Sequence, residues 1–371
     1  MTDASVHVSA ETPKPRARDL GVPFEGRPGP LNAITDVPGV EVGTVTLIRG
    51  EPGPVVEGEG PVRTGVTAIL PRGRRFDPVF AATYALNGNG EMTGTHWIEE
   101  SGFLETPILI TNTFSVGVVR DAVLAWMDRT GCNPDPEAGS WFALPVVAET
   151  YDALNDIRGQ HVTREHAFEA LDSAAGGPVA EGNVGGGTGM IAHGFKGGIG
   201  TSSRLVGGGH SLGVMVQANY GSRERFTVAG VPVGKEIPDL LPSRDVPPGG
   251  SIIVVVATDA PLAPRQLRRL ARRVPLAIGR MGGLGEHSSG DLFIAVSTGN
   301  PGAWAAGEGA MLETWPNDGM DPLFEATVEA TEEAIVNALV AAETMSGRDG
   351  LVVHALPHDR LQRALRKYGR A

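Results

Sequence analysis

The stretch PPGGSIIVVV at residues 247–256 holds the residues best suited to chemistry, because two glycines lead directly into Ser251 and an apolar run. The Ser251 hydroxyl can attack the carbonyl carbon of Gly250 through a tight ring that a Cβ atom would crowd, and glycine reaches strained backbone angles at little cost. Cleavage would make Ser251 a chain end. Its free α-amine, with a pKa of about 8, could then take the proton from its own hydroxyl. The pattern is compatible with a cut between Gly250 and Ser251 that creates both nucleophile and base.

The same residues also fit a plain surface turn that enters a core strand. Four prolines and two glycines over residues 235–250 oppose both helix formation and sheet pairing, so a linker is expected there. The β-branched run after Ser251 is typical of a strand buried on both faces. Such a strand would hold a nucleophile rigidly, while the linker could move away after a cut. Motifs elsewhere in the chain favour the chemical interpretation.

Two of these motifs could assist the serine. In EHSSGDLFIAVS, Ser289 and Asp291 are two residues apart at the start of an expected strand, so both side chains point to one face. A hydroxyl beside a carboxylate could relay a proton and hold an ammonium group. Asn219 ends another expected strand, in VMVQANYG, where its amide could donate to a developing oxyanion. Each motif also fits a simple turn.

Other catalytic chemistries find little support. The glycine clusters at 181–190 and 195–204 lack the Gly-Lys-Ser/Thr of a phosphate loop and fit tight turns, or backbone amides packed near an active site. The nine histidines are scattered and no H-E-x-x-H motif occurs, so we expect no catalytic metal and no other cofactor. The S-x-x-K motif of other serine enzymes is also missing.

The length and net charge of the chain limit the classes of binding partner that we expect. The chain has 371 residues, enough for one large domain or two moderate ones, and its net charge of -12 disfavours nucleic acid and anionic membrane surfaces. No apolar run is long enough to span a membrane. A single cysteine, Cys132, excludes an internal disulfide, and the polar N-terminus lacks a signal peptide, so we expect a cytoplasmic location.

Hydrophobic periodicity predicts both strands and helices. We expect strands at 65–72, 106–117, 140–152, 211–221, 226–234, 251–258 and 291–299. We expect helices at 115–131, 163–177, 263–283, 321–347 and 358–369. Residues 1–25 show no periodicity and are expected to form a loose arm. Because the elements do not alternate strictly, we expect an α+β fold with sheets packed between helical layers.

Several long blocks, in this order, carry a family resemblance: NGNGEMTGTHWIEESGFLETPILITNT, EGNVGGGTGM, FKGGIGTSSR, PPGGSIIVVVATDAPL and SSGDLFIAVSTGN. From about residue 19 to about residue 356 the chain resembles the DmpA family of self-processing aminopeptidases, which includes L-aminopeptidase/D-esterases and β-peptidyl aminopeptidases. The resemblance implies a four-layer αββα sandwich, similar to N-terminal-nucleophile hydrolases but differently connected. It also implies one catalytic domain over residues 26–371, cut into an α chain (1–250) and a β chain (251–371) that stay associated.

The resemblance assigns roles to the residues found above. Ser251 would be the nucleophile, Asn219 an oxyanion donor, and Ser289 and Asp291 a relay beside the new amine. Tyr151 would lie in the pocket near the acyl group. The expected reaction removes N-terminal residues from short peptides, amides or esters through an acyl-enzyme on Ser251. An acidic side chain should hold the substrate's amine, and three candidates are not ranked: Glu91, Glu149 and Asp152.

Other activities stay open at this stage. The β-peptide-preferring members of the family carry glutamate at the second relay position, where this chain has Asp291, so a general aminopeptidase is favoured over a β-peptide-specific one. An acyltransferase of the ornithine-acetyltransferase type is also self-processing, but its nucleophile is usually threonine. A binding protein on an uncut scaffold is the remaining alternative. The resemblance further implies a homo-oligomer, a tetramer of αβ units, with a small peptide or amide as substrate.

Overall fold

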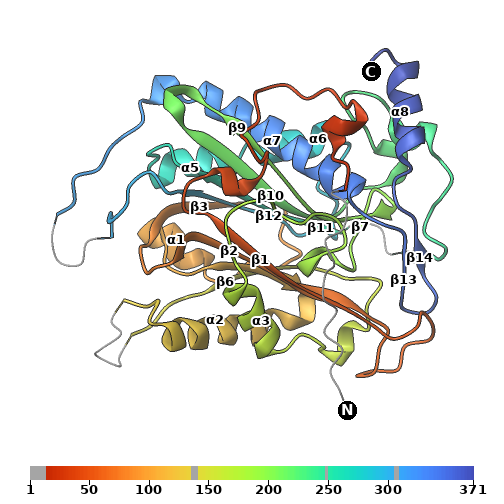
Figure 1. Ribbon diagram of the computed structural model, residues 1–371, viewed down its shortest axis with the longest axis horizontal. Coiled ribbons are helices and arrows are strands. Elements are labelled where there is room, and N and C mark those ends of the chain that lie inside the picture. Colours follow the sequence, from red (N-terminus) through yellow and green to blue (C-terminus); the bar gives the residue numbers. More distant parts are fainter. Residues whose placement is uncertain (1–13, 135–140, 247–249, 305–308) are drawn as a thin grey trace.

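A computed structural model describes residues 14–134, 141–246, 250–304 and 309–371, and Figure 1 shows its two large sheets stacked between helices. The four-stranded sheet has the order β1-β2-β5-β6, with β5 and β6 parallel. Its strands are β1 (Glu41–Arg49), β2 (Val62–Arg74), β5 (Ile108–Asn112) and β6 (Val146–Thr150). The helices α2 (Val116–Thr130) and α3 (Arg164–Asp172) pack on its outer side.

The six-stranded sheet has the order β4-β3-β12-β11-β10-β9, with β11 and β12 parallel at its centre. Its strands are β3 (Val79–Ala85), β4 (Phe103–Leu104), β9 (Gly198–Leu205), β10 (Ser211–Asn219), β11 (Ser251–Thr258) and β12 (Asp291–Ser297). Its outer face is covered by α5 (Pro264–Ala271), α6 (Val274–Arg280) and α7 (Asp321–Val340).

Smaller elements complete the described chain. They are α1 (Thr95–Ser101), α4 (Val233–Glu236), α8 (His358–Lys367), and the two-stranded ribbons β7 (Ile191–Ala192) with β8 (Phe195–Lys196) and β13 (Met345–Ser346) with β14 (Val352–Val353).

Side-chain alternation along β11 explains the layers. Successive residues of a strand point to opposite faces, so Ile252 and Val254 pack under the helices while Ile253 and Val255 pack between the sheets. Every residue of β11 is buried, and each fully buried large aliphatic side chain contributes about 1.5–3 kcal/mol. A third apolar cluster lies between the four-stranded sheet and α2 and α3. The expected αββα sandwich is confirmed.

Most predicted elements are present. The strands expected at 65–72, 106–117, 140–152, 211–221, 251–258 and 291–299 correspond to β2, β5, β6, β10, β11 and β12, and the helices expected at 115–131, 163–177 and 358–369 correspond to α2, α3 and α8. The strands β1, β3 and β9 were not predicted. In β9 the glycines indicated turns, but they allow close packing, because a Cβ on Gly200 would lie 2.0 Å from the Ala334 carbonyl of α7.

Three predicted elements were wrong in extent or type. The helix expected at 263–283 is split into α5 and α6, because Pro275 has no N–H and begins a new helical turn. The strand expected at 226–234 is absent: Ala229 and Gly230 both have positive φ, +50° and +77°, and form a tight turn between Val228 and Val231. The helix expected at 321–347 ends at Val340 because the chain leaves it to pair in the β13–β14 ribbon.

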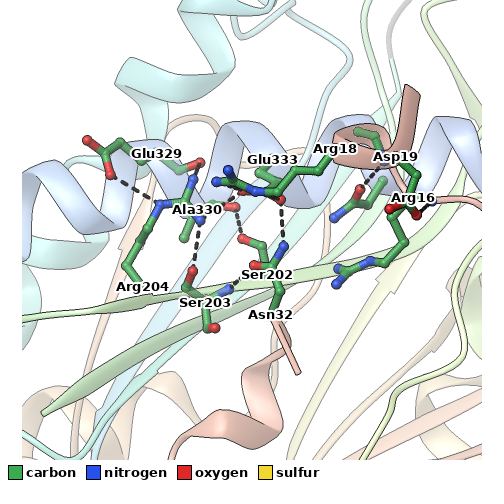
Figure 2. Close-up of polar contacts among 12 residues, drawn as sticks. Arg16, Arg18, Asp19, Asn32, Ser202, Ser203, Arg204, Glu329, Ala330 and Glu333 are labelled. Atoms are coloured by element: carbon green, nitrogen blue, oxygen red, sulfur yellow. Dashed lines mark hydrogen bonds and ion pairs between the residues drawn. The ribbon is translucent and has the colours of Figure 1, made fainter. Parts of the chain in front are cut away.

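The N-terminal segment was expected to be loose, but its described part, residues 14–25, packs on the body of the molecule. Ala17 is fully buried, and its N–H donates to Asn337 Oδ1 at 3.0 Å. The Arg18 guanidinium lies on the carboxylate of Glu333 in α7, with Nε to Oε1 at 2.8 Å (Figure 2). Partly buried ionic contacts of this kind order a segment that has no hydrophobic periodicity. Residues 1–13 lie outside the described chain.

Candidate active site

Ser251 is the first residue of β11 and lies opposite Asn219, the last residue of β10. Its side chain shares the face of Ile253, which packs between the two sheets, and it is only 6% exposed. The backbone N–H of Gly290 donates to Ser251 Oγ at 3.0 Å. The expected strand therefore places this hydroxyl on the inter-sheet face, with an amide donor already on it.

The residue before the serine has to be glycine. Gly250 has a φ of +140°, and a Cβ atom there would lie 2.0 Å from the carbonyl oxygen of Asn219. No side chain fits into that gap without moving the backbone of β10. The prolines and glycine at 247–249, which make up the end of the expected linker, lie outside the described residues.

Ser289 and Asp291 meet as expected from their spacing. The Ser289 hydroxyl lies 2.6 Å from Asp291 Oδ1, and it also contacts the carbonyl oxygen of Gly250. A hydroxyl carries one proton, so Ser289 donates to one of these two oxygens at a time. Asp291 shares the face of Phe293, which packs under the helices. The Ser289–Asp291 pair therefore approaches the Gly250–Ser251 peptide from the opposite side to the inter-sheet face that holds the Ser251 hydroxyl.

The environment of Asp291 sets its proton affinity. Burial raises the pKa of this carboxyl, and the hydrogen bonds from Ser289 and Asn87 work in the opposite direction. Asn87 holds Asp291 twice: its Nδ2 donates to Oδ2 at 3.0 Å, and its Oδ1 accepts from the Asp291 N–H at 2.6 Å. Sequence reasoning missed this asparagine as a site residue. Its only signal was the NGNG motif at 87–90, which resembles an ordinary turn.

Asn219 is held in one orientation. Its Oδ1 accepts the N–H of Ile191 at 2.8 Å, and its Nδ2 donates to the carbonyl of Tyr151 at 3.1 Å. An amide nitrogen has two protons, so one remains to donate to an oxyanion formed beside Ser251. The geometry is compatible with the role predicted for this residue.

Glu149, on β6, is the acidic candidate whose contacts lead to the residues around the serine. Its Oε2 accepts from the hydroxyl of Thr113, and its Oε1 accepts from the N–H of Glu91 at 3.0 Å. A Cβ on Gly90 would lie 3.2 Å from Glu149 Oε1 and 3.0 Å from the Cα of Gly290. The carboxylate is thus packed beside the residue whose amide binds Ser251. Burial raises the pKa of Glu149, and the two hydrogen bonds oppose that increase.

The remaining candidates separate by burial. The Glu91 side chain is exposed, and this residue holds Glu149 through its backbone. Asp152 is fully buried, and burial raises its pKa to about 8, although hydrogen bonds oppose that increase. Glu149 is also buried, at 3% exposed, so its position beside Gly90 and Gly290, and not its exposure, favours it over Asp152. Tyr151 is 39% exposed, and its hydroxyl accepts from Arg348 Nη1 at 3.0 Å.

The described residues contain no group of three or more His, Cys, Asp or Glu side chains placed to hold a metal ion. No helix within the described ranges is long and apolar enough to cross a bilayer.

Comparison with known proteins places this serine site in a family. The model of peptidase family S58 matches residues 32–353. The chain belongs to peptidase family S58. This S58 chain is 53% identical to the beta-peptidyl aminopeptidase BapA of Sphingosinicella microcystinivorans, over 98% of its own length and 94% of the relative's. The predicted relationship to the DmpA family of aminopeptidases is confirmed.

Two solved structures share the fold of the S58 chain. The L-aminopeptidase D-Ala-esterase/amidase of Ochrobactrum anthropi, described as a prototype of the serine aminopeptidases and a variant of the Ntn hydrolase fold, superposes with a TM-score of 0.90 at 50% identity, covering 96% of this chain and 99% of that one. A Burkholderia beta-aminopeptidase superposes with a TM-score of 0.85 at 49% identity, covering 95% and 99%. The Ochrobactrum structure confirms the Ntn-hydrolase-like architecture.

Proposed function

We propose that this S58 chain is a self-processing aminopeptidase that removes N-terminal residues from short peptides, amides or esters through an acyl-enzyme on Ser251. One observation carries the proposal. The Ser289–Asp291 pair contacts the carbonyl of Gly250, while Gly290 binds the Ser251 hydroxyl on the other side of the same peptide bond.

Processing uses the groups on both sides of that bond. Ser251 Oγ attacks the Gly250 carbonyl carbon, the C–N bond breaks as the hydroxyl proton passes to the leaving nitrogen, and the acyl group moves to the hydroxyl oxygen as an ester. Ser289 polarises the carbonyl by donating to its oxygen. Water then hydrolyses the ester, which leaves a carboxylate on Gly250 and a free amine on Ser251. That amine forms within reach of Ser289 and Asp291, which hold its ammonium form.

The two products remain associated because their strands interleave. In the six-stranded sheet, β11 and β12 come from the segment after the cut, and their neighbours β10 and β3 come from the segment before it. Separation would break both hydrogen-bonded ladders and expose the core on each face, so an α chain of residues 1–250 and a β chain of residues 251–371 stay together.

Peptide hydrolysis then repeats the first reaction in trans. Glu149 binds the substrate's ammonium group, and the α-amine of Ser251 takes the proton from its own hydroxyl as Oγ attacks the substrate carbonyl. The oxyanion receives hydrogen bonds from Asn219 Nδ2 and the Gly290 N–H. The α-ammonium protonates the departing amine, and water releases the acyl group from Ser251.

Denaturing electrophoresis and N-terminal sequencing of purified protein test the proposal. Wild type should give two bands, the smaller beginning Ser-Ile-Ile-Val, and Ser251→Ala should give one. Gly250→Ala should slow processing at least tenfold, because its Cβ would collide with the Asn219 carbonyl. A wild-type chain that stays intact, with activity equal to that of Ser251→Ala, would contradict the proposal.

A preference for β-peptides is a second candidate, supported by 53% identity to a beta-peptidyl aminopeptidase. Asp291, one methylene shorter than the glutamate expected in β-peptide-preferring members, favours the general activity. Rates of processed enzyme on matched L-alanyl and β-alanyl p-nitroanilides decide between the two. The cytoplasmic location and the tetramer of αβ units remain predictions, which cell fractionation and light scattering test.

A further inference from the structure

A cation lies close to the proposed site, and neither processing nor acyl transfer uses it. Arg348 is in the turn between β13 and β14, and its backbone N–H donates to the Leu154 carbonyl at 2.8 Å. Its Nη1 donates to the Tyr151 hydroxyl at 3.0 Å. The carbonyl oxygen of Tyr151 in turn accepts a hydrogen bond from Asn219 Nδ2 at 3.1 Å. Two successive contacts, both made by Tyr151, thus connect the guanidinium to Asn219, the residue opposite Ser251.

The guanidinium retains binding capacity. Within the described chain its Nη2 has no hydrogen-bonding partner, and its ion pair is with the adjacent Asp349, at 3.3 Å from Nε, where the two side chains are 38% and 47% exposed. Exposed pairs of this kind are weak, about 0–1 kcal/mol. The Tyr151 hydroxyl accepts from Arg348, so its own proton is free to donate. Arg348 Nη2 and the Tyr151 O–H therefore offer two donors, as a carboxylate requires.

The position of this pair matches the two ends of a short peptide. Glu149 and Tyr151 are two residues apart on an extended chain, about 7 Å, and the tyrosine ring carries the hydroxyl further towards Arg348. An extended peptide advances about 3.3 Å per residue, so di- to tetrapeptides place their charged ends at comparable separations. A carboxylate at one end of the site and a guanidinium at the other complement a zwitterionic peptide.

We propose that Arg348 and Tyr151 form a subsite that binds the C-terminal carboxylate of a short peptide substrate, while Glu149 binds its ammonium group. This proposal rests on the proposed function above. It assigns to Arg348 a role in specificity and predicts a preference for short peptides with a free C-terminus.

Steady-state kinetics on a matched pair of substrates test the subsite. The two substrates are one tripeptide with N-terminal L-alanine, supplied as the free acid and as the C-terminal amide. Both are assayed with the wild type and with Arg348→Met. We expect the wild type to have the lower KM for the acid. In Arg348→Met the ratio of amide KM to acid KM should fall about tenfold, with the same kcat for the acid, because one charge-assisted contact is lost. Arg348→Lys should recover part of the ratio.

Controls separate this subsite from general damage and from the proposed function. Arg363→Met, an exposed arginine on α8, should leave the KM ratio at its wild-type value. An equal rise of both KM values in Arg348→Met, or an unchanged ratio, would overturn the subsite while leaving the aminopeptidase intact. If KM in Arg348→Met rises selectively for a peptide amide with N-terminal glutamate, Arg348 binds a side-chain carboxylate. That result would overturn the assignment of Arg348 to the C-terminal carboxylate. Absence of wild-type turnover on both peptides would overturn the proposed function and this subsite together.

Discussion

Replacing Glu333 by glutamine removes the charge at the centre of the buried ion-pair network between α7 and the N-terminal part of the chain (Figure 2). The Glu333 carboxylate is fully buried and accepts from Arg18 at 2.8 Å, from Asn32 at 2.6 Å and from Arg204 Nη1 at 2.9 Å. All three donors precede the proposed cut and Glu333 follows it. The network therefore joins the two products of processing.

The size of the effect follows from burial. Arg204 is only 1% exposed, so glutamine at position 333 leaves a buried cation whose remaining carboxylate partner is Glu329, at 3.2 Å. Breaking a buried pair on one side costs about 3–5 kcal/mol. Because Glu329 remains, we expect about 3 kcal/mol, which is roughly a hundredfold in the unfolding constant. Asp359→Asn breaks the exposed pair with Arg363 and should cost about 0.3–0.5 kcal/mol.

Urea unfolding at fixed protein concentration measures both changes. The single-chain Ser251→Ala background is used because cleaved chains unfold with a concentration dependence. In processed protein, Glu333→Gln should also release the β chain at a lower urea concentration, as followed by size exclusion. If Glu333→Gln costs no more than Asp359→Asn, the network adds nothing to stability, and the sheet alone joins the chains.

Three further perturbations address individual side chains. Burial raises the pKa of Asp152 from 3.8 to about 8, so folding takes up a proton, and the stability contributed by this group falls as pH rises from about 4 to about 8. Asp152→Asn should flatten that decline, and an unaltered urea midpoint profile would contradict the assignment. Thr113→Val removes a donor to Glu149, which raises the pKa of that carboxyl. KM increases as the pH falls, and in Thr113→Val this increase should begin at a higher pH. In Thr113→Ser it should return to the wild-type pH. If the pH dependence of KM in Thr113→Val is identical to that of the wild type, Glu149 does not bind the ammonium group. Burial raises the pKa of the Cys132 thiol to about 11, so iodoacetamide should alkylate it at least a hundredfold more slowly in native protein than in urea, as read by mass spectrometry; equal rates would show that the thiol is accessible.

The sequence alone predicted the buried strand that begins at Ser251, because a β-branched run is a local signal, and this strand is confirmed. The same residues left both a surface turn and a cut after Gly250 open, and the cut is a proposal. The pairing of Ser289 with Asp291 was also predictable, because side chains two residues apart share a face. The amphipathic helices α2, α3 and α8 followed from their periodicity for the same reason.

Only the tertiary structure decided which distant residues complete the site. Asn87, Thr113 and Arg348 lie outside the strands and far apart in the sequence, and the fold brings them onto Asp291, Glu149 and Tyr151, respectively. Packing also separated the acidic candidates: Glu149, 3% exposed, lies beside Gly90 and Gly290, whereas Asp152 is fully buried. A sequence pattern records what is near along the chain, but a site assembled between layers depends on how these layers pack.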